Sequence, residues 1–351
     1  MNLQNIPSHN QEIRTMFTAS DGCVLIGSDF SQQEPKLLTY YTQDKAMLTS
    51  YAQNKDLYAQ ISSLSFHRKY EDCLEFYPEG TVIVQNGKEV VCGHKTHTNK
   101  EGKDYRNRAK SILLGVMYGR GAASIAEQLH CTTKEANEII NSFYRAFPTV
   151  KGWMDRTVEF ARKNGYVETF YGRRRYIKNI TLPDYEFSYV DNKPRNFNPL
   201  SFDFDEEYTN SVDERDIIKY TKMLDSCVRY SDKEQVKQRA LAEGIKIHDN
   251  GGYLSEAIRQ CVNSRIQGGA ADQSKLAMIN IAKCTELKEL GFKLLIGVHD
   301  ELIGEAPIEN AKRCGELLSE CMRSAASEIL KLPAKCDISI TKCWYGEEVV
   351  L

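Results

Sequence analysis

The feature that most constrains this chain is an apolar run, residues 294–303, which is interrupted by His299, Asp300 and Glu301. The flanking apolar residues predict two short β-strands, residues 294–298 and 302–303, joined by a tight turn that carries the three polar residues. Burying two carboxylates in such a hairpin costs several kcal/mol unless they accept hydrogen bonds or bind a metal ion. A solvated turn, in which Asp is common, explains the same residues. A second carboxylate elsewhere in the chain would favour the metal site.

Asp29 supplies this second carboxylate. It follows a strand of buried type, residues 23–28, and precedes a helical segment that runs through Ser50. A strand that ends in Asp and leads into a helix places the carboxylate at an exposed edge of a sheet. The competing interpretation is that Asp29 caps the N-terminus of that helix.

The composition is that of a globular protein large enough to be an enzyme. Of the 351 residues, 41% are hydrophobic and 27% are charged, which excludes a disordered or membrane-embedded chain. Neither a long apolar run nor a secretory signal is present, so we expect a cytoplasmic protein without a membrane partner. The 11 cysteines form no Cys-x-x-Cys pair and are expected to be reduced thiols. The net charge of −2 does not decide whether nucleic acid binds, because basic segments (95–110 and 173–175) and an acidic one (203–207) coexist.

A helix predicted over residues 105–119 carries Arg106, Lys110, Leu114 and Tyr118 at intervals of four, so these side chains share one face. Two cations followed by an apolar and an aromatic residue suit a phosphate tail at one end and a base at the other. The alternative is an amphipathic surface helix with solvated Arg and Lys.

The next segments predict three helices and a β-hairpin. Residues 166–171 alternate like a strand, and Gly172-Arg173-Arg174-Arg175 turns that strand toward a partner at Tyr176-Ile177. Three adjacent arginines on a turn suit contact with backbone phosphates, and a solvated turn is an equal alternative. The helices cover residues 122–130, 134–146 and 150–163, and Gly165 ends the last of them.

Asn86-Gly87 lies between strand-like residues 81–84 and 89–91 and predicts another hairpin. Four potential zinc ligands surround it, but their spacing fits no common zinc site and favours an exposed hairpin flank. These residues are Cys73, Cys92, His94 and His97.

Residues 256–284 are predicted to be helical at both ends of a polar centre, residues 263–269. If that helix is continuous, Arg259, Asn263 and Gln267 lie on one face, where polar side chains can read base edges or hold sugars. Alternatively, they bond one another in a notch of the core. Helical patterning also follows Asp213, and an amphipathic helix over residues 308–330 and a strand around residues 337–341 complete the chain.

Taken in order, these motifs resemble the C-terminal polymerase region of family A DNA polymerases, the bacterial DNA polymerase I type, and phage members in particular. The similarity covers nearly the whole chain, and motifs in one shared order are far more specific than any of them alone. The motifs are Asn2-Leu3-Gln4-Asn5-Ile6-Pro7, Asp29-Phe30-Ser31-Gln32-Gln33-Glu34, Arg106-x3-Lys110-x7-Tyr118-Gly119, Gly165-Tyr166-Val167-Glu168-Thr169 with Gly172-Arg173-Arg174, Asn263-x3-Gln267-Gly268, and Val298-His299-Asp300-Glu301.

The resemblance implies an α+β fold: a right-hand polymerase palm, built of an antiparallel sheet with packed helices, plus mostly helical fingers. The palm takes residues 1–50 and 251–351, and the fingers take residues 51–250 with insertions near 66–103 and 178–250. Family members carry a thumb, and often an exonuclease, before the point where this chain begins. Both are therefore expected to be absent here, and a separate or excised N-terminal portion is expected as a partner.

The resemblance implies template-directed DNA synthesis: transfer of a nucleotide from a dNTP to a primer 3′-hydroxyl on primer-template DNA. The alternative is a nucleic-acid-binding half of a split polymerase, weakly active or inactive without a thumb-bearing partner. A metal-dependent nuclease explains Asp29 and Asp300 but leaves the face of Arg106, Lys110 and Tyr118 without a function.

The resemblance also implies a role for each matching residue. Asp29, Asp300 and the carbonyl of Phe30 would hold two Mg²⁺ ions, with Glu301 as an auxiliary carboxylate. Lys110 would hold the triphosphate and protonate pyrophosphate. The implied nucleotide-binding residues are Gln32, Glu34, Tyr58, Arg106, Lys110, Leu114 and Tyr118, and the implied DNA-binding residues are Arg259, Asn263, Gln267 and His299.

Glu34 matches the carboxylate that crowds a ribose 2′-hydroxyl in the family, which implies a preference for DNA over RNA synthesis. Leu114 stands where the family usually has Phe or Tyr, which leaves the acceptance of dideoxynucleotides open. Tyr58 stands where His is common, and Pro35-Lys36 and Gly269 also depart from the frequent residues.

Overall fold

The computed structural model describes residues 6, 11–85, 88–93, 96–190 and 212–349 of the chain. These residues divide into two compact units. Unit 1 consists of Met1–Phe160, Tyr166–Arg175 and Cys261–Leu351, and unit 2 of Ala161–Gly165 and Tyr176–Gln260. Most of the N-terminal motif, the Asn86-Gly87 turn, His94 and the acidic residues 203–207 lie outside the described residues.

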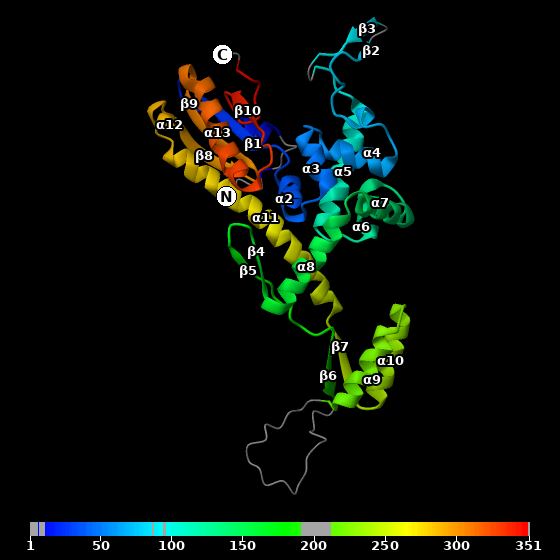
Figure 1. Cartoon of the computed structure of the whole chain (residues 1–351). Helices are drawn as coiled ribbons and strands as arrows, with labels where there is room; N and C mark the ends of the chain where they lie inside the picture. Colours follow the sequence, from blue (N-terminus) through cyan, green and yellow to red (C-terminus); the bar gives the residue numbers. More distant parts are fainter. Residues whose placement is uncertain (1–5, 7–10, 86–87, 94–95, 191–211, 350–351) are drawn as a thin grey trace. The chain divides into compact units, whose positions relative to one another are not determined.

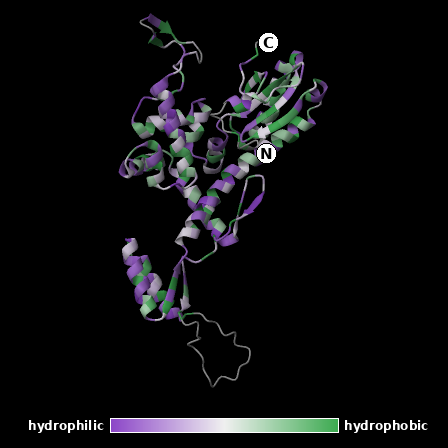
Figure 2. Ribbon diagram, turned by 180° about the vertical axis from the view of Figure 1, so that it is seen from behind, coloured by the Kyte–Doolittle hydropathy of each residue, from purple (hydrophilic) through white to green (hydrophobic). Residues whose placement is uncertain are grey.

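A four-stranded antiparallel sheet, in the order β10-β1-β9-β8, lies within unit 1 (Figure 1). Its strands are β1 (Cys23–Phe30), β8 (Lys293–Val298), β9 (Glu301–Pro307) and β10 (Cys336–Thr341). Alternate residues of a strand point to opposite faces. Val24, Ile26 and Phe30 pack in one core with residues of α11 (Gly251–Lys283) and α13 (Ala311–Leu330), and Figure 2 shows green, hydrophobic residues along these strands. The opposite face of β1 carries Gly27 and Asp29.

The segment after β1 forms two helices, α2 (Gln33–Thr42) and α3 (Lys45–Ala52), where the sequence predicted a single helical segment. The break occurs because Gln43 adopts a left-handed backbone, with φ 50°, and Asp44 caps α3 by accepting a bond from the Ala46 N–H at 3.0 Å. Gln32 occupies the N-cap position of α2. The interpretation of Asp29 as a helix cap is therefore wrong, and Asp29 remains in the strand.

Helices make up the next part of unit 1. They are α4 (Leu57–Phe66), α5 (Lys100–Met117), α6 (Ala122–Leu129), α7 (Thr133–Ala146) and α8 (Pro148–Asn164), of which the last extends into unit 2. α5 begins before the predicted start because Asn99 caps it, accepting a bond from the Gly102 N–H at 3.0 Å. Fully buried Ile112, Leu113 and Phe143 join these helices in one hydrophobic core.

The predicted hairpin after α8 is shorter than expected, with β4 (Tyr166–Glu168) paired to β5 (Arg174–Tyr176). Arg174 and Arg175 therefore lie in a strand and not on the turn. Arg173 ends the turn, and its guanidinium donates to Asp272 at 2.6 Å and to the carbonyl of Gly268 at 2.8 Å. These two bonds commit Arg173 to α11.

Unit 1 also contains several smaller elements. They are α1 (Gln11–Thr15), η2 (Glu71–Cys73), the hairpin β2 (Val82–Gln85) and β3 (Lys88–Val91), α12 (Thr285–Glu289) and η3 (Ile308–Asn310). α13 starts at Ala311, after the predicted residue 308, because residues 308–310 form the 3-10 turn η3.

Unit 2 has a hydrophobic core of its own, built by Tyr220, Leu224 and Ile245 among others. It contains a two-stranded antiparallel sheet of β6 (Tyr185–Tyr189) and β7 (Ile245–Asp249), and the helices α9 (Glu214–Asp225) and α10 (Tyr230–Ala242) come between these strands in the sequence. Among the helices that the structure describes, none combines the length and apolar character needed to span a lipid bilayer.

Candidate active site

The register of the sheet places three carboxylates side by side on the face that carries Gly27. Asp29 of β1 pairs with Asp337 of β10 on one side and with Glu301 of β9 on the other. Opposed side chains on one face of a sheet approach to about 5 Å between Cβ atoms, so these like charges repel. Burial, followed by the charges of Asp337 and Asp300, raises the pKa of Asp29 to about 6, and burial and Asp29 raise the pKa of Glu301. A cation at this row would relieve the repulsion.

The predicted turn between β8 and β9 is confirmed, and it brings Asp300 to the same place. His299 and Asp300 form the turn, His299 has a positive φ of 54°, and Glu301 begins β9 where the sequence put it on the turn. The Phe30 N–H donates to the carbonyl of Asp300 at 3.1 Å. This bond holds the turn beside the end of β1, and both Asp29 and Asp300 line one cavity.

That cavity has a volume of about 740 Å³ and gathers most of the residues singled out in the sequence. From this set, the residues that line it are Asp29, Phe30, Gln32, Glu34, Tyr58, Arg106, Lys110, Leu114, Tyr118, Gln267, His299 and Asp300. Arg259 and Asn263 lie on α11, which is one continuous helix, but they are not part of the lining. The Oδ1 atom of Asn263 is buried without a hydrogen-bond partner among the described residues.

The shared face of α5 is confirmed, because Arg106, Lys110, Leu114 and Tyr118 all line this cavity. Lys110 is exposed and has no carboxylate within 4.0 Å among the residues that the structure describes. The helix therefore presents a cation beside an apolar and an aromatic side chain. The charge of this cation is opposite in sign to that of the carboxylates in the same cavity.

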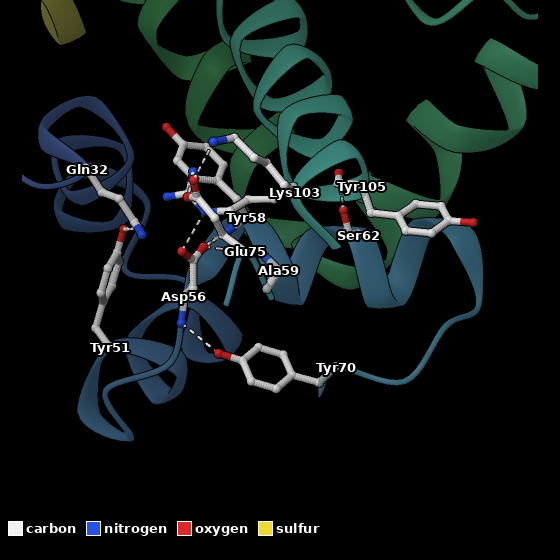
Figure 3. A network of polar contacts seen from close by, with 11 residues as sticks. Gln32, Tyr51, Asp56, Tyr58, Ala59, Ser62, Tyr70, Glu75, Lys103 and Tyr105 are labelled. Atoms are coloured by element: carbon white, nitrogen blue, oxygen red, sulfur yellow. Dashed lines mark hydrogen bonds and ion pairs between the residues drawn. The ribbon is translucent and has the colours of Figure 1, made fainter. Parts of the chain in front are cut away.

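Arg106, by contrast, is already held by two carboxylates, Asp56 and Glu75, which are labelled in Figure 3. Its Nε donates to Asp56 at 2.8 Å, and its Nη1 lies 3.6 Å from Glu75, which also pairs with Lys103 at 3.0 Å. The guanidinium lies 5.2 Å from the ring centroid of Tyr58. Burial opposes the charge on Arg106, but Asp56 and Glu75 raise its pKa overall. Orientation of this side chain is thus fixed before any ligand binds.

Glu34 and Tyr118 meet across the cavity. The Tyr118 hydroxyl lies 2.8 and 2.7 Å from the two carboxylate oxygens of Glu34, and a Gln267 side chain also hydrogen-bonds Tyr118. Burial raises the pKa of Glu34, whereas the bond from Tyr118 opposes that rise. On the adjoining side, Gln32 accepts a bond from Tyr51 at 3.1 Å.

Sequence reasoning missed Asp337. A strand around residues 337–341 was predicted, and an Asp at its start was the available signal, but only the register with β1 reveals that it opposes Asp29. Among the described residues, no three His, Cys, Asp or Glu side chains converge as a complete metal site. Cys73, Cys92 and His97, three of the four potential zinc ligands, are among the residues to which this applies. All 11 cysteines are free thiols, as expected.

Comparison with known sequences relates the chain to one family of enzymes. The sequence model described as DNA polymerase family A matches residues 1–75, 88–193 and 215–346. The chain is 28% identical over 347 residues to DNA polymerase I of Caldicellulosiruptor bescii and 29% identical over 348 residues to DNA polymerase I of Geobacillus stearothermophilus. Each match covers 98% of this chain but only 30% and 29% of the relative. The chain thus spans about a third of the length of these relatives.

Among solved structures, the fold is similar to the POL domain of Pol1 from M. smegmatis in complex with DNA primer-template and dNTP. The TM-score is 0.64 and the identity 23%, over 98% of this chain and 44% of that chain. This similarity supports the mixed α+β architecture of palm and fingers type.

Proposed function

The chain belongs to DNA polymerase family A, and we propose that it catalyses template-directed DNA synthesis from deoxynucleoside triphosphates. One observation carries the proposal: a single cavity of unit 1 has Asp29 and Asp300 in its wall together with the Arg106, Lys110 and Tyr118 face of α5. Nucleotidyl transfer from a triphosphate needs both the carboxylates and the cations. Cationic side chains hold the phosphates, and carboxylates bind the metal ions that act on the reacting phosphate.

Divalent metal ions are general cofactors of family A polymerases, and the residues here fit Mg²⁺. Asp29, Asp300 and the carbonyl of Phe30 offer the hard oxygen ligands that Mg²⁺ prefers, and burial, together with the charges of Asp337 and Asp300, raises the pKa of Asp29. The described side chains form no complete site by themselves, so substrate oxygens would complete the ligand set. Two bound Mg²⁺ ions would lower the pKa of the primer 3′-hydroxyl and stabilise the leaving oxygen.

The side chains of this chain have separate tasks in the proposed reaction. The primer 3′-hydroxyl loses its proton to water, its oxygen forms a bond to the α-phosphorus, the bond from this phosphorus to the bridging oxygen breaks, and pyrophosphate leaves. Lys110, with Arg106 held in place by Asp56 and Glu75, neutralises the phosphates, and Lys110 donates a proton to the leaving pyrophosphate. Leu114 and Tyr118 pack near the nascent base pair.

Glu34, held by Tyr118, occupies the space that a ribose 2′-hydroxyl would need, which favours deoxynucleotides. Tyr58 and Gln32 contribute to the nucleotide side of the cavity. Primer-template DNA would be contacted by Arg259, Asn263, Gln267 and His299, of which Gln267 and His299 line the cavity. In this proposal residues 1–50 and 251–351 form the palm, and residues 51–250 form the fingers with insertions.

Primer extension by the purified chain tests the proposal. Asp29→Asn and Asp300→Asn should each lower the rate of single-nucleotide extension by roughly a thousandfold or more. Asp225→Asn is the matched control, because Asp225 is exposed on α9 in unit 2 and lines no part of the cavity. Fluorescence anisotropy with a labelled primer-template measures binding in the same samples.

Full extension by either cavity variant would contradict the metal-binding role. Binding of primer-template without any extension by the wild-type chain would support the alternative of a nucleic-acid-binding half of a split polymerase.

A further inference from the structure

A second cavity, with a volume of about 550 Å³, adjoins the cavity described above, which we call the nucleotide cavity after its proposed ligand. The two share Ser31, Gln32, Arg106 and Asp337 in their walls. Arg106 thus stands between them, and an anion that leaves the first cavity on the Arg106 side enters the second. The proposed function gives no task to this second space.

Three lysines line the second cavity, and the most buried of them is Lys36 in the first turn of α2. Its residue is only 7% exposed, and its Nζ lies 6.0 Å from the ring centroid of Tyr51, which also lines the cavity. Burial, with a smaller effect of the nearby Lys335 charge, lowers the pKa of Lys36 to about 8. A buried cation is costly unless an anion accompanies it.

The other two lysines are exposed at the cavity wall. The Ser31 N–H donates to the carbonyl of Lys335 at 3.0 Å, which fixes the segment that carries Lys335 beside the end of β1. Lys55 lies with its Nζ 5.4 Å from the ring centroid of Tyr70, and the Tyr70 hydroxyl is held by the Asp56 N–H at 2.8 Å. Both backbones are therefore anchored.

The carboxylates of the second cavity are unequally available. Asp56 and Glu75 are committed to Arg106. Asp337 belongs to the carboxylate row with Asp29, and Glu79 is exposed. Within the described part of the chain, Lys36, Lys55 and Lys335 have no carboxylate within 4.0 Å. The cavity thus keeps three cations without a protein counter-ion next to a site that would release a polyanion.

We propose that Lys36, Lys335 and Lys55 form a subsite for inorganic pyrophosphate, which holds this product after it leaves the nucleotide cavity. The inference rests on the proposed function, because that reaction makes pyrophosphate. Lysine ammonium groups are compact point charges suited to phosphate oxygens. Arg106, whose orientation is fixed by Asp56 and Glu75, lies at the boundary that the product passes.

Isothermal titration calorimetry with inorganic pyrophosphate, in buffer without added metal, tests the subsite on the full chain. Lys36→Met keeps the length and apolar stem of the buried side chain, and it should raise the dissociation constant about tenfold. Lys335→Gln, at an exposed position, should raise it about threefold. Lys312→Gln is the control, because Lys312 is an exposed lysine of α13 that lines neither cavity, and it should change nothing.

Unchanged affinity in both Lys36→Met and Lys335→Gln would overturn the subsite, and so would equal affinity of the wild-type chain for orthophosphate and pyrophosphate. If Lys110→Gln alone abolishes binding, pyrophosphate is held in the nucleotide cavity and the subsite is also overturned. Calorimetry needs no DNA synthesis, so the two proposals can fail separately. If the chain does not extend a primer but binds pyrophosphate in a way that depends on the lysines, the proposed function is refuted and the subsite stands.

Discussion

Lys36→Met should make unit 1 more stable at neutral pH, and the gain should disappear in alkali. The folded chain lowers the pKa of Lys36 from 10.5 to about 8, chiefly by burial. Between these two values the unfolded chain binds more protons than the folded one, so the stability of the wild-type chain rises with pH in that window. Below pH 8 the full penalty of the buried cation is present.

The size of the effect follows from the same numbers. The difference between 10.5 and about 8 corresponds to at most about 3 kcal/mol, and water at the cavity mouth reduces this to about 1–2 kcal/mol. We therefore expect the unfolding free energy of Lys36→Met to exceed that of the wild-type chain by about 1–2 kcal/mol at pH 7. At pH 10.5 this difference between the two proteins should be smaller by about the same 1–2 kcal/mol.

Urea unfolding followed by tryptophan fluorescence measures this difference in unit 1 alone, because the 2 tryptophans, Trp153 and Trp344, both lie there. Other groups that titrate in alkali are common to both proteins and cancel in the comparison. A variant that is less stable than the wild type at pH 7, or a gap that stays constant up to pH 10.5, would refute the argument that burial penalises the Lys36 charge.

Three other substitutions test separate parts of unit 1. Glu34→Ala opens the space near the proposed ribose position and should raise ribonucleotide incorporation by roughly tenfold or more in single-nucleotide extension, and unchanged discrimination would remove Glu34 from that role. Asp44→Ala removes the cap of α3 and the acceptor of the Thr149 hydroxyl, 2.7 Å away, and should cost about 1–3 kcal/mol in urea unfolding. Gly102→Ala would drive a methyl group into the carbonyl of Leu74 and should cost about 1–3 kcal/mol, and full stability would show that this segment shifts freely.

Local patterns were sufficient for much of the fold. The apolar run around His299 and Asp300 predicted the β8–β9 hairpin, because a short apolar run with a polar interruption favours two strands joined by a turn. The four-residue spacing from Arg106 to Tyr118 predicted one helix face, because helix geometry alone fixes it.

Boundaries were less predictable where side chains compete with the backbone. Asp44 starts α3 inside what the sequence predicted as a single helical segment, and Asn99 starts α5 early, because a cap forms only where the side chain meets free N–H groups. The predicted strand of residues 166–171 ends at Glu168, and the side chains of Thr169 and Arg173 beyond it both donate to Asp272, a partner distant in the sequence.

The sequence by itself determined which residues are candidates for the chemistry, since the types and local spacing of Asp29, Arg106, Lys110 and Asp300 are written in the chain. Only the tertiary structure decided what surrounds them. Strand register, which no local pattern encodes, set Asp337 opposite Asp29. Long-range packing likewise joined Glu75 to Arg106 and left Lys36 buried without a carboxylate partner among the described residues, because the electrostatic environment depends on neighbours that the chain brings together only when it folds.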